Sequence, residues 1–528
     1  MAQGIAIDIG TSGIRGQLVD LNSGEVVRTC ITSRNPIPGA NVMDHMTFAI
    51  DYGLESAHRI MISAILEVIG KLDPKSLKRM SVCGNPIQLS IFEGIDIRDL
   101  AYAGDNKKRN ENVPIIDRIG HVAKGAAIGL PNVDVIIPPS VRHEIGADAL
   151  AMMLKSGFLD DDMCMVTDYG TNAEMALKVG DSIYTGSAAA GPAMEGQHIR
   201  CGMIAGPGAV SDLERITTGW KVKVLNDDLV TEDGPVINLR SDMRTNEGKI
   251  PTGITGTGVV ALIYGLMKDD RIVDGKIRNG PIKITRTIDF SNNDYHEAGK
   301  AIGAIRAGHL TLMLTAGVDP KKITKMYMAG ASGTYVDPVK SKEIGLIIPY
   351  CDTVKQVGNT SLQLAKDILL DPSMLDDLNK LRDKLVTKHV MFASSDIFSE
   401  LYVQEYAYWS DGMPLNRYRR ILSNFYDVEG YLDDKVEITD LQSNERDIVD
   451  IGESISIIDL NYSMSESHDC TRCMKCVKDC PEHALTFEDD TFSINTGRCL
   501  GTACNRCQEN CPEKCFNYSS FVFSVKKP

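Results

Sequence analysis

The chain has 528 residues and a mass of 57.7 kDa, a length that corresponds to roughly three or four domains. Hydrophobic residues make up 43% and charged residues 24%, which is the composition of a soluble globular protein. The 71 acidic residues outnumber the 56 basic ones, and the net charge of −15 disfavours non-specific binding to nucleic acid or to an anionic membrane. No apolar run approaches the ~18–20 residues of a spanning helix, and the first residues lack the basic region of a signal peptide. We therefore expect a cytoplasmic protein with no nucleic-acid or membrane partner.

The first predicted element is a β-hairpin. An apolar strand at residues 5–9 precedes a turn with glycine and hydroxyl side chains, and a second strand follows at residues 14–20. The turn consists of Gly10, Thr11, Ser12 and Gly13. Its N–H groups and hydroxyls are suited to hold phosphate, and Asp8 at the strand end is suited to hold Mg²⁺ through water. In the alternative interpretation Asp8 only caps a turn.

A second hairpin repeats this pattern about 160 residues later. Between residues 165 and 177, two apolar strands flank Asp168, Gly170, Thr171 and Asn172. Two matching hairpins predict a duplicated β-rich core that faces one nucleotide. The chain contains no P-loop sequence, and the first hairpin has no dinucleotide-binding glycine loop.

Helical patterns fill the intervals between the predicted strands. Residues 51–70 place one apolar face at helical spacing. The residues on this face are Leu54, Ala57, Ile60, Met61, Ala64, Ile65 and Val68. A second helix is expected at residues 296–315, with Asp294 as its N-cap and Gly317 as its C-cap. Hairpins that alternate with such helices predict α/β layers.

A third glycine-containing turn follows the apolar residues 326–329. It consists of Gly330, Ala331, Ser332 and Gly333. Because glycine lets a backbone approach a ligand closely, we expect this turn to contact the adenosine of a bound nucleotide.

Residues 427–460 form an acidic stretch. They hold eleven Asp and Glu side chains against Lys435 and Arg446, so they supply −9 of the net charge of −15. Alternating apolar residues at 436–438 and 454–457 predict short strands. We interpret the stretch as a solvated connector, with a docking surface for a partner as the alternative.

Nine of the 14 cysteines are concentrated between Cys470 and Cys515. A disulfide scaffold would spread its cysteines across a small secreted domain. Their concentration in a short segment of a long chain therefore favours metal binding.

This segment contains two ferredoxin-like runs, C-x2-C-x2-C-x3-C-P and C-x4-C-x2-C-x3-C-P, in which the fourth cysteine of each run ligates the other cluster. They predict two 4Fe–4S clusters that move electrons singly. The first takes Cys470, Cys473, Cys476 and Cys511, and the second takes Cys480, Cys499, Cys504 and Cys507. Four-thiolate zinc sites also use C-x2-C spacing, but proline after each fourth cysteine matches iron–sulfur better. Cys515 is surplus, and we expect it to be a small buried residue.

These motifs resemble those of a known superfamily. The hairpins at 8–13 and 168–171 and the turn at 330–333 resemble the phosphate-1, phosphate-2 and adenosine motifs of the actin, heat-shock-chaperone and sugar-kinase ATPases. More specifically, most of residues 1–425 resemble the ATP-dependent reductive activators of corrinoid proteins. The supporting stretches are 145–148, 168–174, 187–196, 253–258 and 358–361. A C-terminal two-cluster module is similar to that of the methanogen activators that serve methylamine methyltransferases.

The resemblance implies an α/β fold with a two-lobed actin-like ATPase core and a C-terminal α+β ferredoxin-like domain. The implied domains are lobe I at 1–163, lobe II at 164–426, the acidic connector at 427–460 and the cluster module at 461–528. It also implies that Asp8 and Asp168 organise Mg²⁺. The implied ATP-binding residues are Gly10, Thr11, Ser12 and Gly13 in the first hairpin, Gly170, Thr171 and Asn172 in the second, and Gly330, Ala331, Ser332 and Gly333 in the third turn.

The resemblance further implies a reaction. Corrinoid proteins of methyltransferases work through Co(I), which occasionally oxidises to Co(II), and the activator returns the electron with ATP. Moving one electron against 100 mV costs about 2.3 kcal/mol, and a nucleotide that prefers one conformation ~10⁴-fold shifts an equilibrium by roughly 5.5 kcal/mol. We therefore hypothesise that ATP changes the coordination of the corrinoid, while the clusters only deliver an electron from a low-potential donor such as a ferredoxin.

Two other functions remain open. The first is an ATP-driven activator of a 2-hydroxyacyl-CoA dehydratase or a benzoyl-CoA reductase, although those activators usually build one cluster across a dimer interface. The second is a small-molecule kinase with an electron-transfer tail, in which eight cluster ligands would have no role.

Overall fold

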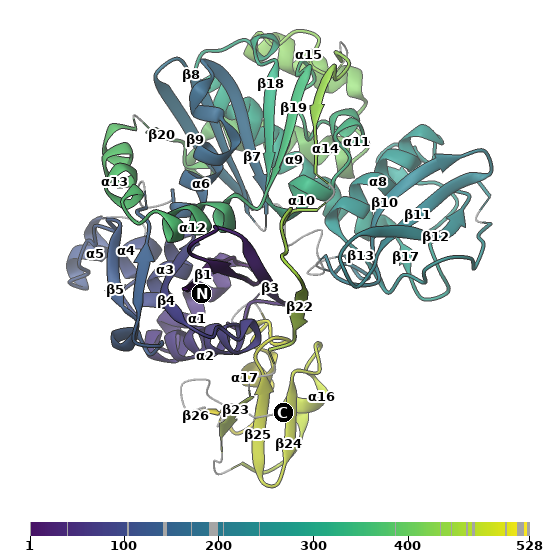
Figure 1. The fold of residues 1–528 in the computed structure, drawn as a ribbon. Coiled ribbons are helices and arrows are strands. Elements are labelled where there is room, and N and C mark those ends of the chain that lie inside the picture. The colour runs from purple at the N-terminus through teal and green to yellow at the C-terminus, as the bar shows by residue number, and fades with distance from the viewer. Residues whose placement is uncertain are drawn as a thin grey trace. The chain divides into compact units, whose positions relative to one another are not determined.

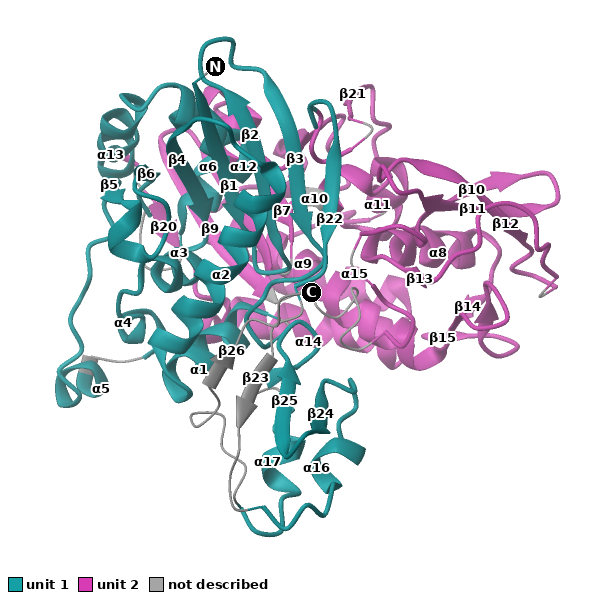
Figure 2. Ribbon diagram, turned by 60° about the horizontal axis from the view of Figure 1, so that its bottom comes forward, with its two compact units in different colours: residues 1–151, 361–384, 450–528 teal, residues 152–360, 385–449 magenta. Residues whose placement is uncertain are grey.

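The computed structural model describes residues 2–39, 41–102, 105–140, 145–170, 172–189, 199–203, 205–241, 243–385, 387–432, 435–444, 446–460, 463–466, 470–501, 504–514 and 522–524. The described chain forms two compact units, and each unit draws on separate stretches of sequence (Figure 2). Unit 1 takes residues 1–151, 361–384 and 450–528, and unit 2 takes residues 152–360 and 385–449.

Unit 1 is built on a mixed β-sheet (Figure 1). Its strands in spatial order are β22 (Ile455–Ile458), β3 (Val26–Thr32), β2 (Ile14–Asp20), β1 (Gln3–Ile9), β4 (Leu77–Gly84), β6 (Asp134–Ile137) and β5 (His121–Lys124). The strands β1, β2 and β3 form an antiparallel meander, which confirms the first predicted hairpin, and β4 runs parallel to β1. Every residue of β1 is buried, as expected for a central strand with both faces covered.

Helices accompany this sheet. They are α1 (Val42–Asp51), α2 (Leu54–Leu72), α3 (Pro86–Glu93), α4 (Arg98–Ala101), α5 (Asp105–Asn110), the first part of α6 (Ala147–Ser156), α12 (Thr360–Leu370) and α13 (Met374–Lys384). The predicted apolar face at 51–70 is buried in α2 from Ala57 onward. The predicted start at Asp51 is wrong, because Gly53 takes a left-handed φ of 104° and separates α1 from α2.

Unit 2 repeats the plan of unit 1. The strands of its main sheet in spatial order are β20 (Thr387–His389), β9 (Ser182–Ala189), β8 (Asn172–Val179), β7 (Met163–Tyr169), β18 (Lys325–Ala329), β19 (Thr353–Gly358) and β21 (Asp440–Gln442). The order β9-β8-β7-β18-β19 matches β3-β2-β1-β4-β6, with an antiparallel meander followed by parallel strands in each case. The predicted duplication is therefore confirmed.

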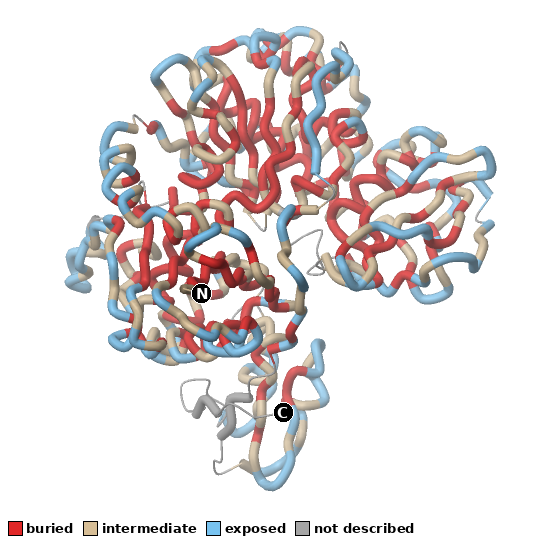
Figure 3. The backbone as a smooth tube through the Cα atoms, in the orientation of Figure 1, coloured by how far each residue is buried: buried red, intermediate tan, exposed pale blue. Residues whose placement is uncertain are grey.

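A second sheet and several helices complete unit 2. This sheet has the order β12 (Thr231–Ile237), β11 (Gly219–Leu225), β10 (Ala209–Ile216) and β13 (Gly253–Ile254). The helices include α8 (Gly256–Lys268), α9 (Asn292–Thr315), α10 (Gly330–Tyr335), α11 (Pro338–Ile344), α14 (Asp396–Ser410) and α15 (Leu415–Tyr426). The predicted N-cap Asp294 is wrong: Ser291 caps α9, and Asp294 is the third helical residue of a capping box. Figure 3 shows that buried residues concentrate along the central strands.

The C-terminal module of unit 1 is a small α+β fold. Its strands in spatial order are β24 (Leu485–Glu488), β25 (Thr491–Asn495), β23 (Ser463–Glu466) and β26 (Val522–Ser524), and its helices are α16 (Lys475–Lys478) and α17 (Arg506–Glu509). The acidic stretch before it contributes an edge strand to each main sheet, β21 to unit 2 and β22 to unit 1. The predicted strand at 454–457 corresponds to β22, whereas the one at 436–438 is wrong, because the backbone enters a strand only at Asp440.

Candidate functional site

The turn of the first hairpin is closed by its own backbone. The N–H of Gly10 donates to the carbonyl of Gly13 at 3.0 Å. A Cβ at Gly10 would lie 2.9 Å from that carbonyl oxygen, so a larger residue there would push the turn open. Thr11 and Ser12 are half-buried between the two glycines, and the buried Asp8 precedes them at the end of β1. The structure thus brings the predicted residues of this hairpin together at one tip.

A residue that was not predicted, Asn35, holds this turn from the side. Its backbone N–H donates to the carbonyl of Ser12 at 2.9 Å, and its side-chain amide donates to the carbonyl of Gly10 at 2.8 Å. Asn35 is buried, with 6% of its surface exposed. Because buried carbonyls need hydrogen-bond partners, Asn35 fixes the shape of the turn.

Acidic side chains gather beside the turn. Burial, with a smaller contribution from the neighbouring Asp8 carboxylate, raises the pKa of Asp148 to about 7. The Nη1 atom of Arg15 lies 3.7 Å from the Oδ2 atom of Asp8. Burial, Asp148 and Asp8 also raise the pKa of the Cys83 thiol. Two carboxylates forced together in this way form a site that a divalent cation would stabilise.

Sequence reasoning assigned no role to Asp148. The signal was present, because an acidic residue interrupts the apolar run at 145–153 and lies in one of the stretches that resemble the activator family. An acid inside an otherwise buried helix is rare unless it has a partner or a ligand.

A third contact to the turn comes from the start of α3. Asn85 caps this helix, since its Oδ1 accepts from the N–H of Gln88 at 2.9 Å. Its side-chain amide donates to the hydroxyl of Thr11 at 3.1 Å. One Asn therefore connects the helix terminus to a predicted phosphate-binding residue.

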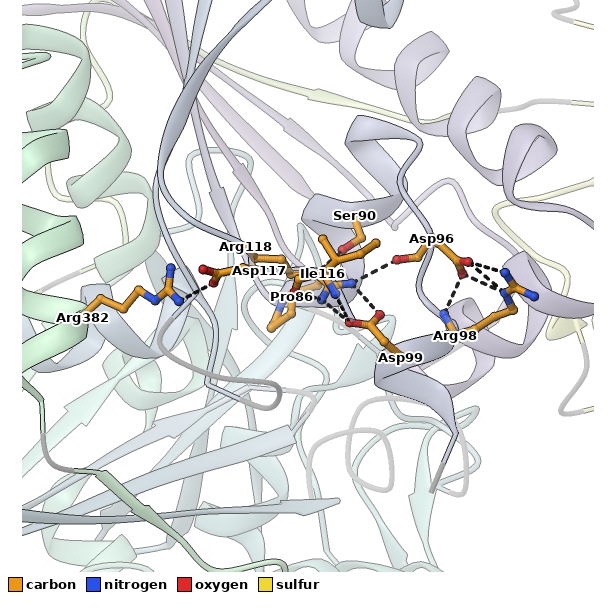
Figure 4. Close-up of polar contacts among 9 residues, drawn as sticks. All are labelled: Pro86, Ser90, Asp96, Arg98, Asp99, Ile116, Asp117, Arg118 and Arg382. Atoms are coloured by element: carbon orange, nitrogen blue, oxygen red, sulfur yellow. Dashed lines mark hydrogen bonds and ion pairs between the residues drawn. The ribbon is translucent and has the colours of Figure 1, made fainter. Parts of the chain in front are cut away.

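Figure 4 shows how α3 is held in place. Arg118 donates to both carboxylate oxygens of Asp99 at 2.8 and 2.9 Å and to the hydroxyl of Ser90 on α3 at 2.9 Å. The Arg118 and Asp99 side chains are largely buried, which makes this bidentate pair stronger than an exposed one. The pair fastens segment 113–120, which precedes β5, to α3 and α4.

The second hairpin places its acid against a glycine of the third turn. Parallel pairing of β7 with β18 sets Asp168 opposite Ala329. The next residue, Gly330, has a φ of 80°, and a Cβ there would lie 2.2 Å from Oδ1 of Asp168. Gly170 is also close, since its Cβ would lie 3.3 Å from the same oxygen, and Asn172 begins β8. Thr171 lies outside the described residues.

The third turn is the start of a helix. Gly330, Ala331, Ser332 and Gly333 form the first turn of α10, which follows β18 without an intervening loop. Buried Gln356 donates from Nε2 to the carbonyls of Gly333, Thr334 and Val336, at 2.6, 3.0 and 2.9 Å. This one side chain binds the C-terminal carbonyls of α10 and so fixes the helix against β19.

The cysteines predicted for the second cluster line one cavity. Cys480, Cys499, Cys504 and Cys507 line this cavity together with apolar residues that include Leu485. A 4Fe–4S cluster binds one thiolate at each iron, so we expect its four ligands to line a common cavity. These four residues therefore fit an iron–sulfur cluster.

Of the other four cysteines, three belong to the first run and Cys511 belongs to the second. Burial raises the pKa of Cys476, and charges on nearby Cys470 and Cys473 raise it further. Cys511 directly follows Asn510, whose side-chain amide donates to Asp479 at 3.0 Å and so links the two runs. Among the described residues, no three Cys, His, Asp or Glu side chains are grouped to hold a single metal ion. Cys515 lies outside the described residues.

Backbone amides point at several of these sulfurs. The N–H groups of Arg472, Ala484 and Gly501 donate to Sγ of Cys470, Cys480 and Cys499, at 3.3, 3.2 and 3.4 Å. Hydrogen bonds to thiolate sulfur are one of the means by which proteins set the reduction potential of an iron–sulfur cluster. Within the part of the chain that the structure describes, no helix is both long and apolar enough to cross a bilayer.

Comparisons with known proteins agree with this architecture. A family model described as "RACo middle region" matches residues 3–161, and one described as "C-terminal domain of RACo the ASKHA domain" matches residues 162–419. The Co(II) methylated amine-specific corrinoid protein reductase of Methanosarcina barkeri is 42% identical over 516 residues, which cover 95% of each chain. The corrinoid activation enzyme RamQ of Eubacterium limosum is 26% identical over 438 residues, 76% of this chain and 69% of that one.

A solved structure is also similar. The reductive activator for a corrinoid, iron–sulfur protein superposes with a TM-score of 0.63 at 25% sequence identity, covering 77% of this chain and 66% of that one. The matched ASKHA description names the actin-like superfamily, so the predicted fold class is confirmed.

Proposed function

Because this chain belongs to the family of reductive activators of corrinoid proteins, we propose that it uses ATP to reduce the Co(II) corrinoid of a methyltransferase protein to Co(I). The observation that carries the proposal is 42% identity, over 95% of both chains, to a reductase of a methylated amine-specific corrinoid protein. The same relative favours methylamine as the methyl donor and methanogenesis as the process served. The corrinoid protein and a low-potential electron donor such as a ferredoxin are the proposed partners.

We assign nucleotide binding to the two hairpins and to α10. Asp8 and Asp168 organise Mg²⁺, and Asp148 adds a third carboxylate near the first of them. Phosphate oxygens accept hydrogen bonds from the turn residues Gly10, Thr11, Ser12, Gly13, Gly170, Thr171 and Asn172. The backbone at Gly330, Ala331, Ser332 and Gly333 approaches the adenosine. The support for this assignment is the equivalent position of Asp8 and Asp168 at the ends of β1 and β7 in the duplicated sheets.

We assign two 4Fe–4S clusters to the C-terminal module, held by the two sets of four cysteines. When bound, such clusters accept and release single electrons. The chain supplies thiolates, N–H donors to their sulfurs and an apolar wall that limits water. The cavity lined by Cys480, Cys499, Cys504 and Cys507 supports the second set.

The energetics explain why one chain carries both parts. An opposing gap of a few hundred millivolts costs several kcal/mol for one electron, at about 2.3 kcal/mol per 100 mV. A nucleotide that stabilises one conformation ~10⁴-fold supplies roughly 5.5 kcal/mol. We propose that the ATP-bound conformation alters the axial coordination of the bound corrinoid, which makes its reduction feasible.

An anaerobic optical assay tests the proposal. The purified protein with its clusters, a chemical reductant and the Co(II) methylamine corrinoid protein are mixed with or without Mg-ATP. We expect the Co(I) spectrum only with ATP. Equal Co(I) formation without nucleotide would contradict the role of ATP, and phosphorylation of a small molecule without Co(I) formation would favour a kinase.

A further inference from the structure

A short segment of unit 1 contacts both the nucleotide turn and the cluster module. It follows β3 and comprises residues 33–39, here called the coupling segment. One end of this segment holds Asn35, which binds the turn at the carbonyls of Gly10 and Ser12. The other end, four residues later, is Gly39.

Gly39 binds the backbone of a predicted cluster ligand. Its N–H donates to the carbonyl of Cys499 at 3.0 Å. The preceding Pro38 lies against Gly501, where a Cβ would come within 3.0 Å of the Pro38 carbonyl oxygen. The N–H of Gly501 in turn donates to Sγ of Cys499 at 3.4 Å. The coupling segment therefore fixes both the backbone of Cys499 and the amide that bonds to its sulfur.

A buried polar network stiffens the segment. The Asn35 amide donates to Oε1 of Gln88 at 3.4 Å, and Gln88 Nε2 lies 2.7 Å from Nδ1 of His45. Gly39, with a φ of 133°, packs directly on the His45 ring. All three polar side chains are buried, and burial lowers the pKa of His45 to about 4, so the network is uncharged at neutral pH. Because unpaired buried polar groups are costly, these residues are expected to move together.

A second anchor joins the same surfaces. The hydroxyl of Tyr52, between α1 and α2, lies 3.3 Å from Oδ1 of Asn505 and 3.4 Å from Oε1 of Gln508. Asn505 lies between Cys504 and Cys507. Tyr52 thus attaches the body of unit 1 to the loop that carries two further ligands of the same predicted cluster.

We propose that the coupling segment transmits nucleotide binding at the first hairpin to the second cluster and lowers the reduction potential of that cluster. The inference rests on the proposed function and adds a second role for ATP, which acts on the relay as well as on the corrinoid. Phosphate bound at the turn accepts hydrogen bonds from its N–H groups and hydroxyls and so reorients the turn whose carbonyls Asn35 binds, and the shift reaches Cys499 through Gly39. The physical warrant is a continuous set of contacts that runs from the buried Asn35 to the half-buried Gly39 and Cys499.

The sign of the effect follows from charge. Reduction adds a negative charge to the cluster, and bound nucleotide adds negative charge to the same unit, so each disfavours the other. By linkage, the factor by which ATP favours the oxidised cluster equals the factor by which the oxidised protein favours ATP. We expect this factor to be about tenfold. For a one-electron couple it corresponds to a fall of about 59 mV in the midpoint potential of the cluster.

A redox titration of the full-length, cluster-loaded protein tests the coupling. Electron paramagnetic resonance follows the clusters with no nucleotide and with a saturating non-hydrolysable ATP analogue and Mg²⁺. We expect one of the two midpoint potentials to fall by about 59 mV, which corresponds to the tenfold factor. Nucleotide affinity, measured separately on oxidised and reduced protein, should be about tenfold higher for the oxidised form. Hydrogen exchange should show slower exchange in peptides covering 36–39 and 497–501 when nucleotide binds.

Three variants distinguish transmission through the coupling segment from a direct electrostatic effect of bound nucleotide on the cluster. Asn35→Ala removes the side-chain bond to the Gly10 carbonyl and keeps the backbone bond to Ser12, so it should reduce the difference in potential to the part that charge alone produces, while nucleotide still saturates. Tyr52→Phe keeps the packing and loses only the hydroxyl, so it tests the coupling even if Asn35→Ala fails to fold, and it should reduce the difference. Tyr102→Phe, a tyrosine of unit 1 outside these contacts, is the matched control and should leave the difference unchanged.

Specific results would overturn the inference. Midpoint potentials that do not respond to nucleotide in the unmodified protein would contradict it, as would an undiminished response in both Asn35→Ala and Tyr52→Phe. If ATP-dependent Co(I) formation persisted while the potentials stayed constant, the coupling would be wrong and the proposed function would stand. If Co(I) formation did not depend on ATP, the proposed function would fail first.

Discussion

The two hairpins occupy equivalent positions in the two main sheets, yet their acids have different surroundings. In unit 1, Asp8 is buried beside Asp148 and Arg15, and Asn35 and Asn85 bind the turn through their side chains. In unit 2, Asp168 is half-buried and faces the backbone of Gly330. The first turn is therefore shaped by polar side chains, and the second by the close approach of a helix terminus.

This difference indicates that the two turns of the duplicated scaffold have different roles. A turn enclosed by titratable and amide side chains can respond to cation, proton and the redox state of the module it contacts. A turn that lies against glycine backbone is suited to recognise shape. Matched positions in the two units allow this difference in roles to be tested.

The largest effect is expected at Gly330. Gly330→Ala places a Cβ 2.2 Å from Asp168 Oδ1 at a φ of 80°. The left-handed backbone costs roughly 1–2 kcal/mol, which is about 5–30-fold, and displacement of the Asp168 carboxylate adds to it, so we expect nucleotide affinity to fall by ~100-fold. The equivalent Gly84 has no left-handed φ, and its Cβ would lie 2.7 Å from the Ile9 carbonyl. Gly84→Ala should therefore be milder. Isothermal titration with an ATP analogue measures both.

Gly70→Ala is the control for these substitutions. Gly70 lies inside α2 with nothing within 4 Å of an added Cβ. Alanine there should raise the free energy of unfolding by about 0.5–1 kcal/mol and leave nucleotide affinity unchanged. Equal losses of affinity at Gly330 and Gly84 would contradict the proposed difference between the two turns.

The two acids should differ in what their loss does to the nucleotide-free protein. Asp8→Asn and Asp168→Asn should each weaken Mg²⁺-dependent ATP binding by about 10–100-fold, the usual effect of losing a group that orients metal ligands. Only Asp8→Asn removes a charge that raises the pKa of Asp148, so only this variant should increase stability without Mg²⁺ at pH 8. Thermal unfolding in a chelator compares them, and a gain in both variants would contradict the comparison.

The amides that support the two turns give a smaller effect. Gln356→Ala leaves three carbonyls of α10 without its amide and should cost about 1–3 kcal/mol of unfolding free energy. Asn85→Ala removes the cap of α3 and the bond to Thr11 and should cost about 0.5–2 kcal/mol. Chemical denaturation measures both. If Asn85→Ala cost more than Gln356→Ala, the turn of unit 1 would carry more of the fold's stability than we infer.

The smallest effect is the pH dependence from Asp148. Its pKa is raised from 3.8 to about 7 in the folded protein, so the folded state binds this proton more tightly than the unfolded state. Its contribution to the free energy of unfolding therefore falls as the pH rises from about 4 to about 7. Asp148→Asn should remove this loss and raise the melting temperature of the nucleotide-free protein by about 2 °C more at pH 8 than at pH 5. An equal gain at both pH values would contradict the assignment.

The parts predicted from the sequence are those that local pattern determines. Both hairpins and the apolar face of α2 follow from residues that are neighbours in the chain, and the cysteine runs have ligand spacings that few other structures need. The helix ends were less predictable, because Gly53 and Ser291 act through backbone conformation and capping. The strand near residue 440 was displaced because its position depends on pairing with β19.

The missed site residues act over long distances in sequence. Asn35, Asn85 and Asp148 reach the first turn only because β3, β4 and α6 converge at one end of the sheet. No local pattern marks them as a group. The boundaries of the two units also have no local signal, because each unit combines separate stretches of the chain. Residues 361–384 belong to unit 1 although they follow most of unit 2 in the sequence.

The central claim is that nucleotide drives an electron from the cysteine module to the corrinoid. Stopped-flow spectroscopy tests it most directly: pre-reduced, cluster-loaded protein is mixed with Co(II) corrinoid protein, with no other reductant, in the presence or absence of Mg-ATP. We predict that cluster oxidation and Co(I) formation proceed with one shared rate constant and only with ATP. Cluster oxidation at the same rate without ATP, or Co(I) formation without cluster oxidation, would contradict the account.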